Sequence, residues 1–198
     1  MTNCTESCVF INKRNDDYMT WLVEILGPVI LGSKPAEILS FPKYNEKSLH
    51  KIEEIEKYIG QCRRISYKMF KFRNNSTKII FYNRNALDEH LREYRNMKFL
   101  KNLQYPEQYS LEIYLEHMID KMKEGVIPHE IGVFLGYPLK DIMGFMGHTS
   151  LKLTKVNGWR IYGDPGVSDR KFKEFLDCKE RIRKLLEISR PEKILLSI

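Results

Sequence analysis

The sequence lacks a long hydrophobic segment. Its longest uncharged apolar run, around Ile25 to Leu31, is broken by a glycine and a proline. A transmembrane helix needs roughly 20 apolar residues, so we expect no membrane-spanning helix and no membrane partner. The first residues also lack a basic lead, and the apolar run Cys8 to Ile11 is too short for the core of a signal peptide. These absences favour a cytoplasmic location.

Cysteine is scarce as well. The four cysteines, at positions 4, 8, 62 and 178 of 198 residues, are too few and too scattered for a disulfide scaffold, so reduced thiols are expected. Cys4 and Cys8 stand four positions apart instead of the three of a zinc ribbon, and Cys178 is expected as a small apolar residue on a helix.

The common catalytic motifs are missing too. No Gly-x-Ser-x-Gly occurs, which leaves a hydrolase with a nucleophile elbow unsupported. The segment Gly27 to Lys34 has the glycine spacing of a phosphate-binding loop, but Ser33 precedes Lys34 and so reverses the order that phosphate binding requires. We expect a helix end there, with Gly32 as a left-handed cap.

The composition is that of a folded protein. Of its 198 residues, 42% are hydrophobic and 12% aromatic, enough to bury a core in one domain. No linker or low-complexity tract divides the chain, so we expect a polar arm over residues 1–15, one domain over 16–190 and a C-terminal tail over 191–198. The formal net charge of +7 favours polyanionic partners, but the basic residues are spread along the sequence.

Hydrophobic spacing predicts several amphipathic helices separated by a β-hairpin. Helical spacing begins near Tyr18, and it returns around residues 49–59, 87–94, 111–122 and 139–145 and in a long C-terminal segment. Two β-branched and aromatic runs flank Arg73-Asn-Asn-Ser and predict the hairpin, and Trp159-Arg-Ile-Tyr reads as a later strand. This order predicts an α+β fold, with a small, mostly antiparallel sheet made of the hairpin and the late strand and covered by helices.

The segment 128–138 (PHEIGVFLGYP) is the strongest candidate for a functional region. It combines glycines, prolines and the ionisable pair His129-Glu130 in an apolar run. A zinc-protease motif is excluded because position 133 is valine where a second histidine is required. A metal site made of His117, Asp120 and His129 could form only if the fold brought these residues together, and we expect none.

The segment 129–146 also resembles a helix-turn-helix. Gly132, Gly136 and Ile142 occupy the positions of the small residue, the turn glycine and the apolar anchor of that motif. The second helix offers one lysine and one aspartate to a DNA groove, which makes it a poor reader of bases. Basic residues and aromatics also alternate on the predicted hairpin, so nucleic acid remains an open alternative partner.

Two segments carry a family resemblance. PHEIGVFLGYP followed by GWRIYGD is similar to a bacterial family of unknown function, number 3793 among domains of unknown function, and GPVILGSKPAEILSF resembles the family's Lys-Pro-Ala segment. The resemblance runs from about Trp21 to Leu186 and implies a fold without an activity. Relatives often carry a histidine where Ile25 stands and cysteines before the Gly-Trp block, where Lys155 to Asn157 stand, so no catalytic residue is carried over.

These observations favour a cytoplasmic binding or regulatory module of unknown ligand and cofactor. Aromatic and ionisable groups around glycine turns are typical of a binding surface. The candidate residues for that surface are His129, Glu130, Tyr137, Trp159, Tyr162 and Asp164. An enzyme that uses His129 and Glu130 is the alternative, and it requires these two to converge with His117 and Asp164 in one pocket.

Overall fold

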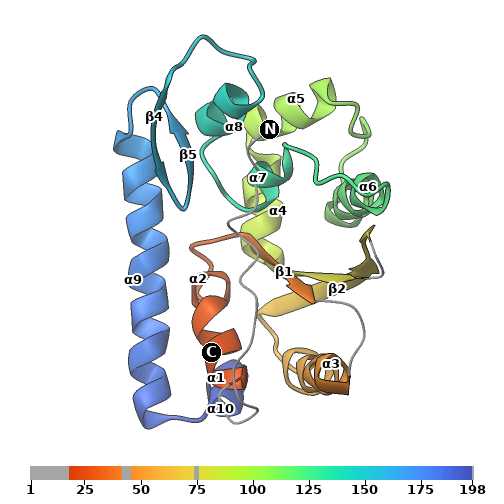
Figure 1. The fold of residues 1–198 in the computed structure, drawn as a ribbon, viewed down its shortest axis with the longest axis vertical. Helices are drawn as coiled ribbons and strands as arrows, with labels where there is room; N and C mark the ends of the chain where they lie inside the picture. Colours follow the sequence, from red (N-terminus) through yellow and green to blue (C-terminus); the bar gives the residue numbers. More distant parts are fainter. Residues whose placement is uncertain (1–17, 42–45, 74–75, 198) are drawn as a thin grey trace.

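A three-stranded antiparallel sheet lies at the centre of the computed structural model, which describes residues 18–41, 46–73 and 76–197. The expected polar arm over residues 1–15 lies outside the described residues. The strands are β1 (Ala36–Phe41), β2 (Ile65–Lys71) and β3 (Thr77–Asn83), in the order β1-β3-β2 (Figure 1). Strands β2 and β3 form the predicted hairpin, with Ile65 opposite Asn83. Strand β1 was not predicted, and it pairs with the other side of β3.

Helices cover both faces of this sheet. They are α1 (Tyr18–Ile25), α2 (Gly27–Ile30), α3 (Glu46–Ile59), α4 (Arg84–Arg92), α5 (Tyr94–Asn102), α6 (Leu111–Lys123), α7 (Ile131–Phe134), α8 (Leu139–Phe145), α9 (Gly166–Ile188) and α10 (Pro191–Ser197). Figure 1 shows α4 to α8 above the sheet and α3 below it, with α9 running along the side of the molecule.

The central strand separates two hydrophobic cores. Because side chains alternate along a strand, Ile80 and Tyr82 point into one core while Ile79 and Phe81 point into the other. The first core packs the sheet against α4 to α8, and the second packs it against α1, α2, α3, α9 and α10. Full burial of β3 except for Asn83 at its end explains its nearly continuous apolar sequence.

The late strand forms a second, separate sheet. Strand β5 (Trp159–Tyr162) is present as predicted, but it pairs with β4 (Leu153–Asn157) instead of extending the hairpin. We call this two-stranded sheet the ribbon. A helix-rich α+β fold with small antiparallel sheets is therefore confirmed, with β1 in the place expected for the late strand.

The end of the chain packs against the second core. The segment expected as a C-terminal tail is helical over Pro191–Ser197, and it buries Ile194 and Leu195 there. Helix α9 thus runs from the ribbon at one end of the molecule to α10 at the other (Figure 1). Within the described ranges, none of the helices has the length and apolar character needed to cross a membrane.

Candidate functional site

A buried carboxylate joins the ribbon to two helices. Asp141 on α8 is 2% exposed and accepts four hydrogen bonds. Two come from Trp159 Nε1 at 2.8 Å and the Tyr162 backbone N–H at 2.9 Å, both on β5. The others come from Ser168 Oγ on α9 and from Lys140 Nζ, each at 2.6 Å. We call this group the Asp141 junction, and it fixes α8, β5 and α9 to one another.

The charge of Asp141 fits this role. Burial by itself raises the pKa of the carboxyl, but the hydrogen bonds from Lys140, Ser168, the Tyr162 backbone and Trp159 outweigh burial and hold the pKa below its usual value. The carboxylate therefore stays ionised at neutral pH. Lys140 also donates to the Tyr162 carbonyl at 2.8 Å, so both backbone polar groups of Tyr162 bind α8 side chains.

Aromatic rings surround the junction. The Tyr137 and Trp159 rings stack with centroids 4.6 Å apart and an interplanar angle of 18°. Phe172 and Phe175 of α9 contact the other sides of Trp159, at 5.9 and 6.1 Å between centroids. Tyr137, Trp159 and Tyr162 were expected together, and the structure brings them together, but as half-buried members of an internal cluster.

A buried lysine completes the cluster. Lys34 is 7% exposed, and its Nζ lies 2.7 Å from Glu37 Oε2 and 5.6 and 5.5 Å from the ring centroids of Tyr137 and Phe175. Burial lowers the pKa of Lys34, and Glu37 more than compensates, so the net pKa is raised and the ammonium stays charged. Next to it, Pro35 packs against Gly136, whose φ of +76° is left-handed. The Lys-Pro segment thus meets the 128–138 segment.

The remaining expected residues of this surface lie outside the cluster. Asp164 is exposed and accepts a hydrogen bond from the Gly166 N–H at 3.0 Å, at the start of α9. His129 is exposed, and its ring meets Phe145 edge-on at 4.9 Å between centroids. Glu130, by contrast, is 4% exposed and binds Lys121 Nζ, with the Tyr105 hydroxyl 3.5 Å away. Adjacent in sequence, His129 and Glu130 therefore face different neighbours.

The four residues required by the enzyme hypothesis do not form one reactive group. The ring of His117 packs on Tyr105 with centroids 4.4 Å apart, and the Tyr105 hydroxyl lies beside Glu130. His129 instead contacts Phe145. Asp164 binds the Gly166 N–H. Burial, with help from Glu130, raises the pKa of Tyr105 and keeps its hydroxyl protonated.

The same region shows no metal centre. Asp120 forms an ion pair with Lys123 at 2.8 Å, and His117 is stacked on an aromatic ring. Among the residues that the structure describes, no group of three or more His, Cys, Asp or Glu side chains is placed to hold a metal ion. The fold therefore does not bring His117, Asp120 and His129 together as metal ligands.

The packing of residues 129–146 fits the helix-turn-helix interpretation only in part. Helix α7 has only four residues, and α8 is wedged between the first core and the ribbon. A Cβ on Gly132 would lie 2.9 Å from Ile142, and a Cβ on Gly144 would lie 2.5 Å from Tyr162, so both glycines serve close packing. The Asp141 junction holds α8 against β5, so β5 covers part of the helix that this interpretation places in a DNA groove.

The ribbon is exposed to solvent along β4, on the side that the Asp141 junction does not cover. Val156 and Leu153 on β4 are 63% and 50% exposed. Arg160, opposite Val156 on β5, lies 5.4 Å from the Phe145 ring centroid, and that ring also contacts His129. These contacts connect β4, β5, α8 and His129 into one surface, which we call the ribbon surface.

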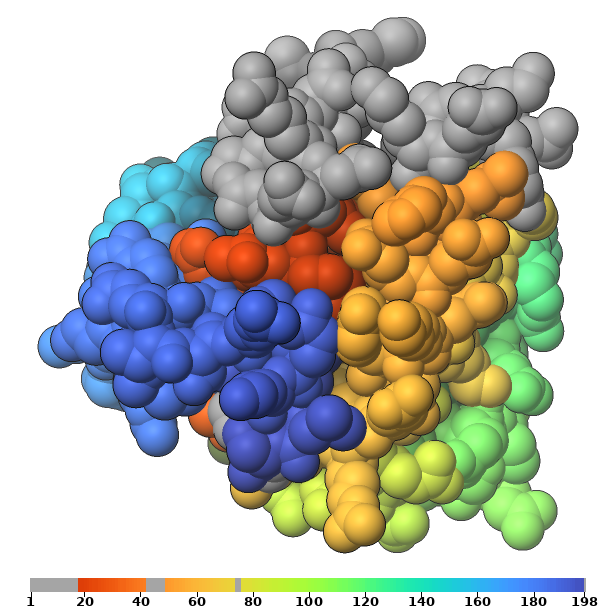
Figure 2. Space-filling model, turned by 90° about the horizontal axis from the view of Figure 1, so that it is seen from below, coloured from red at the N-terminus to blue at the C-terminus, as the bar shows by residue number. Residues whose placement is uncertain are grey.

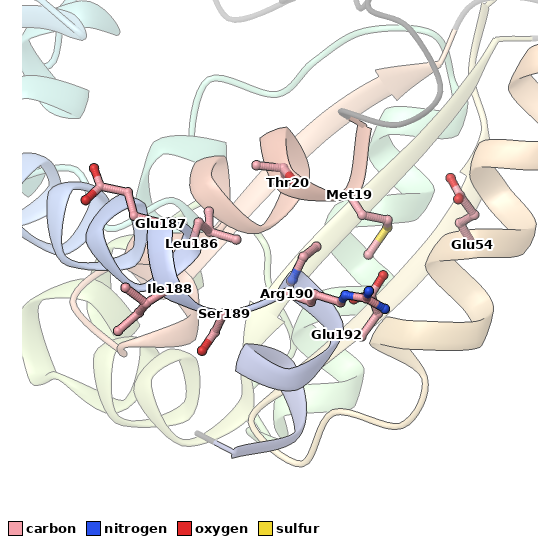
Figure 3. A pocket seen from close by; sticks show the side chains of 10 residues that line it. Met19, Thr20, Glu54, Leu186, Glu187, Ile188, Ser189, Arg190 and Glu192 are labelled. Carbon is pink, nitrogen blue, oxygen red and sulfur yellow. The ribbon is translucent and has the colours of Figure 1, made fainter.

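A hollow lies at the opposite end of α9. Its volume is about 810 Å³, and Figure 2 shows α1, which contributes to its lining, reaching the surface between α3 and the end formed by α9 and α10. Its charged lining residues are Glu54, Glu187, Arg190 and Glu192. Figure 3 shows Arg190 and Glu192 between α10 and α3, while Glu187 points away from them. The lining has no aromatic ring and none of the expected site residues.

The comparisons with known proteins identify one family. A family model described as a protein of unknown function, DUF3793, matches residues 22–195. The chain belongs to the DUF3793 family. No curated protein and no solved structure matches it. Family membership therefore brings no activity to this DUF3793 protein, and its function has to be argued from the site.

The most important residues of the site were not predicted from the sequence. In the sequence, Asp141 is one polar residue on the second helix of a helix-turn-helix. Lys34 belongs to a segment whose Ser-Lys order excludes a phosphate-binding loop. Ser168, 0% exposed, carried no signal at all.

Proposed function

We propose that this DUF3793 protein is a single-domain, cytoplasmic bacterial module that binds another protein through the ribbon surface. The proposal is supported by where the family-signature residues lie. Trp159 and Tyr162 are bound to the Asp141 junction, so their polar groups serve the fold. A buried, charged junction of this kind fixes the orientation of the ribbon that it holds. The junction thus holds the ribbon surface in a fixed orientation.

The single observation that carries the proposal is the exposure of β4. Every residue from Leu153 to Val156 is exposed, although this strand contains two large apolar side chains. An exposed apolar patch that sits on a rigid support, with cationic groups beside it, is typical of a protein-interaction site. Enzyme activity has less support, because the candidate acid-base residues face different neighbours.

Photo-crosslinking in the native cells tests the proposal. A photoreactive amino acid at Val156 would report on the ribbon surface, and the same amino acid at Leu176 on α9 is the matched control, since the two side chains are 63% and 48% exposed. We expect a discrete protein adduct from position 156 that is absent from position 176. The exchange Arg160→Glu, on the same surface, should reduce its yield. Equal, diffuse adducts from both positions would contradict a binding role for the ribbon.

A further inference from the structure

We infer that the open edge of β4 accepts an extended, acidic segment of the partner, which pairs with it as an added strand. The inference rests on the proposed function and names the chemistry of the partner at the same surface. Strand addition supplies backbone hydrogen bonds for affinity and alternate side-chain contacts for specificity.

The two edges of the ribbon differ. On β5, the N–H and carbonyl of Tyr162 bind Asp141 and Lys140, so α8 covers that edge. Tyr162 stands opposite Leu153. Because both polar backbone groups of Tyr162 point away from β4, the two residues form a non-hydrogen-bonded pair, and the N–H and carbonyl of Leu153 point toward the other edge. Within the described residues, no strand pairs with that edge of β4.

The positive charge of the ribbon favours an acidic partner segment. Residues 142–163 contain no aspartate or glutamate, whereas Lys152, Lys155 and Arg160 all lie in this stretch. Lys155 is paired with Asp169 of α9 at 2.8 Å. Lys152, which is exposed and directly precedes β4, has no carboxylate within ion-pair distance among the described residues, so its charge is available to a carboxylate of an incoming strand. Arg160 on β5 lies over the Phe145 ring and adds positive charge one strand away. Complementary charge across an interface gives register and specificity.

Exposed apolar side chains on and beside β4 favour a partner segment that also carries apolar residues. Leu151 is 40% exposed, in addition to Leu153 and Val156 on β4. An added strand would lay side chains beside them at intervals of two residues, so a partner segment that alternates apolar and acidic residues fits both features. A bulge between Leu153 and Lys155 shifts the register of β4 against β5 and limits how long the regular pairing can be.

A second copy of this chain fits the edge poorly. Pairing β4 with β4 of another molecule would bring together two ribbons that each carry Lys152, Lys155 and Arg160 and have no acidic residue within 142–163. Like charges placed opposite one another destabilise a strand pair. The charge of the edge therefore favours a different, acidic chain.

Binding of three synthetic peptides to the full-length protein tests the inference. The first is an N-acetylated, C-amidated, fluorescein-labelled octapeptide that alternates valine and glutamate. The second has lysine for glutamate, and the third is the first peptide with methylated backbone nitrogens. We expect saturable binding of the glutamate peptide by fluorescence anisotropy, at least about tenfold weaker binding of the lysine peptide, and loss of binding on methylation.

Matched variants locate the binding. Lys152→Glu should weaken binding of the glutamate peptide by about tenfold, while Lys173→Glu, the same charge change at an exposed position on α9, should leave it unchanged. Leu153→Pro removes the outward N–H without touching the pairing with β5 and should abolish binding. Circular dichroism of each variant shows whether it is folded, and Lys152→Glu carries the test if the proline variant is not.

Several outcomes would overturn the inference. These are binding of neither peptide, equal binding of the glutamate and lysine peptides, and undiminished binding of the methylated peptide. A dimer in sedimentation equilibrium that Lys152→Glu strengthens would assign the edge to a second copy. If the crosslink from Val156 is found but the glutamate peptide does not bind, strand addition fails while the proposed function stands, and absence of the crosslink rejects the function itself.

Discussion

Removal of the Asp141 carboxylate should be among the most damaging single changes in this protein. Asp141→Ala leaves three donors without an acceptor, namely Trp159 Nε1, the Tyr162 N–H and the fully buried Ser168 Oγ. Lys140 loses one of its two acceptors and keeps the Tyr162 carbonyl. One hydrogen bond to a charged group contributes roughly 1.5–3 kcal/mol, and losing one side of a buried charged network costs about 3–5 kcal/mol. We expect a loss of about 3–5 kcal/mol in the free energy of unfolding, out of the 5–15 kcal/mol typical of a folded domain.

Urea unfolding followed by tryptophan fluorescence at pH 7 measures this loss. The control is Asp177→Ala at an exposed position on α9, which should change the free energy of unfolding by less than about 0.5 kcal/mol. A loss below about 1 kcal/mol for Asp141→Ala would refute the role of the junction, because the three donors that depend on this carboxylate would then have found other acceptors.

The pH dependence of the stability difference between wild type and Asp141→Ala gives a second check. The pKa of Asp141 is lower in the folded protein than its ordinary value, so the folded state favours the ionised carboxylate. Its contribution to stability is therefore complete above the unfolded pKa of about 3.9, and it is lost as pH falls through the folded pKa. The gap in stability between wild type and Asp141→Ala should stay constant from neutral pH down to about pH 5 and narrow below about pH 4.

Three further predictions concern other parts of the fold. Gly136→Ala should lower the free energy of unfolding by about 2–4 kcal/mol, because the new Cβ would lie 2.4 Å from Pro35 Cδ and the φ is +76°. The control is Gly147→Ala, at a φ of +74° with no atom near the new Cβ, which should cost only about 1 kcal/mol. Urea unfolding measures both. Lys121→Met leaves the buried Glu130 carboxylate unpaired, and we expect a loss of roughly 2 kcal/mol at pH 7. Burial lowers the pKa of His90, so wild-type stability should fall as pH drops below about 6.5, and His90→Gln should flatten that slope in thermal unfolding.

The helices and the central hairpin could be predicted because their signals are local. The runs around β2 and β3 contain β-branched and aromatic residues on either side of a polar turn, and the longer helices, such as α6 and α9, show apolar residues at helical spacing. The short helix α10 lacks such a run and was expected as a tail. Strand β1 was missed because Ala36 to Phe41 has only six residues and its apolar run is interrupted by Glu37 and Ser40. Only the pairing with β3, far away in the sequence, makes it a strand.

The site could be predicted only in part, because it depends on distant contacts. Tyr137 and Trp159 stood out as aromatic residues near glycines, and they do stack. Nothing local distinguishes Asp141 from a solvent-exposed aspartate beside a lysine, since three of its four donors lie 18 to 27 residues further along the chain. The same holds for Lys34, whose surrounding rings come from α9 and from the 128–138 segment.

The most direct test of the ribbon as a strand-accepting edge is a backbone NMR titration of the isotope-labelled protein with the valine–glutamate octapeptide. Strand addition predicts saturable shifts of the β4 amides, Leu153 above all, together with slowed hydrogen exchange of the Leu153 N–H, while the amides of α9 near Leu176 stay unchanged. Shifts that map to the hollow between α1, α3 and α10, or a β4 that does not respond at saturating peptide, would contradict the account.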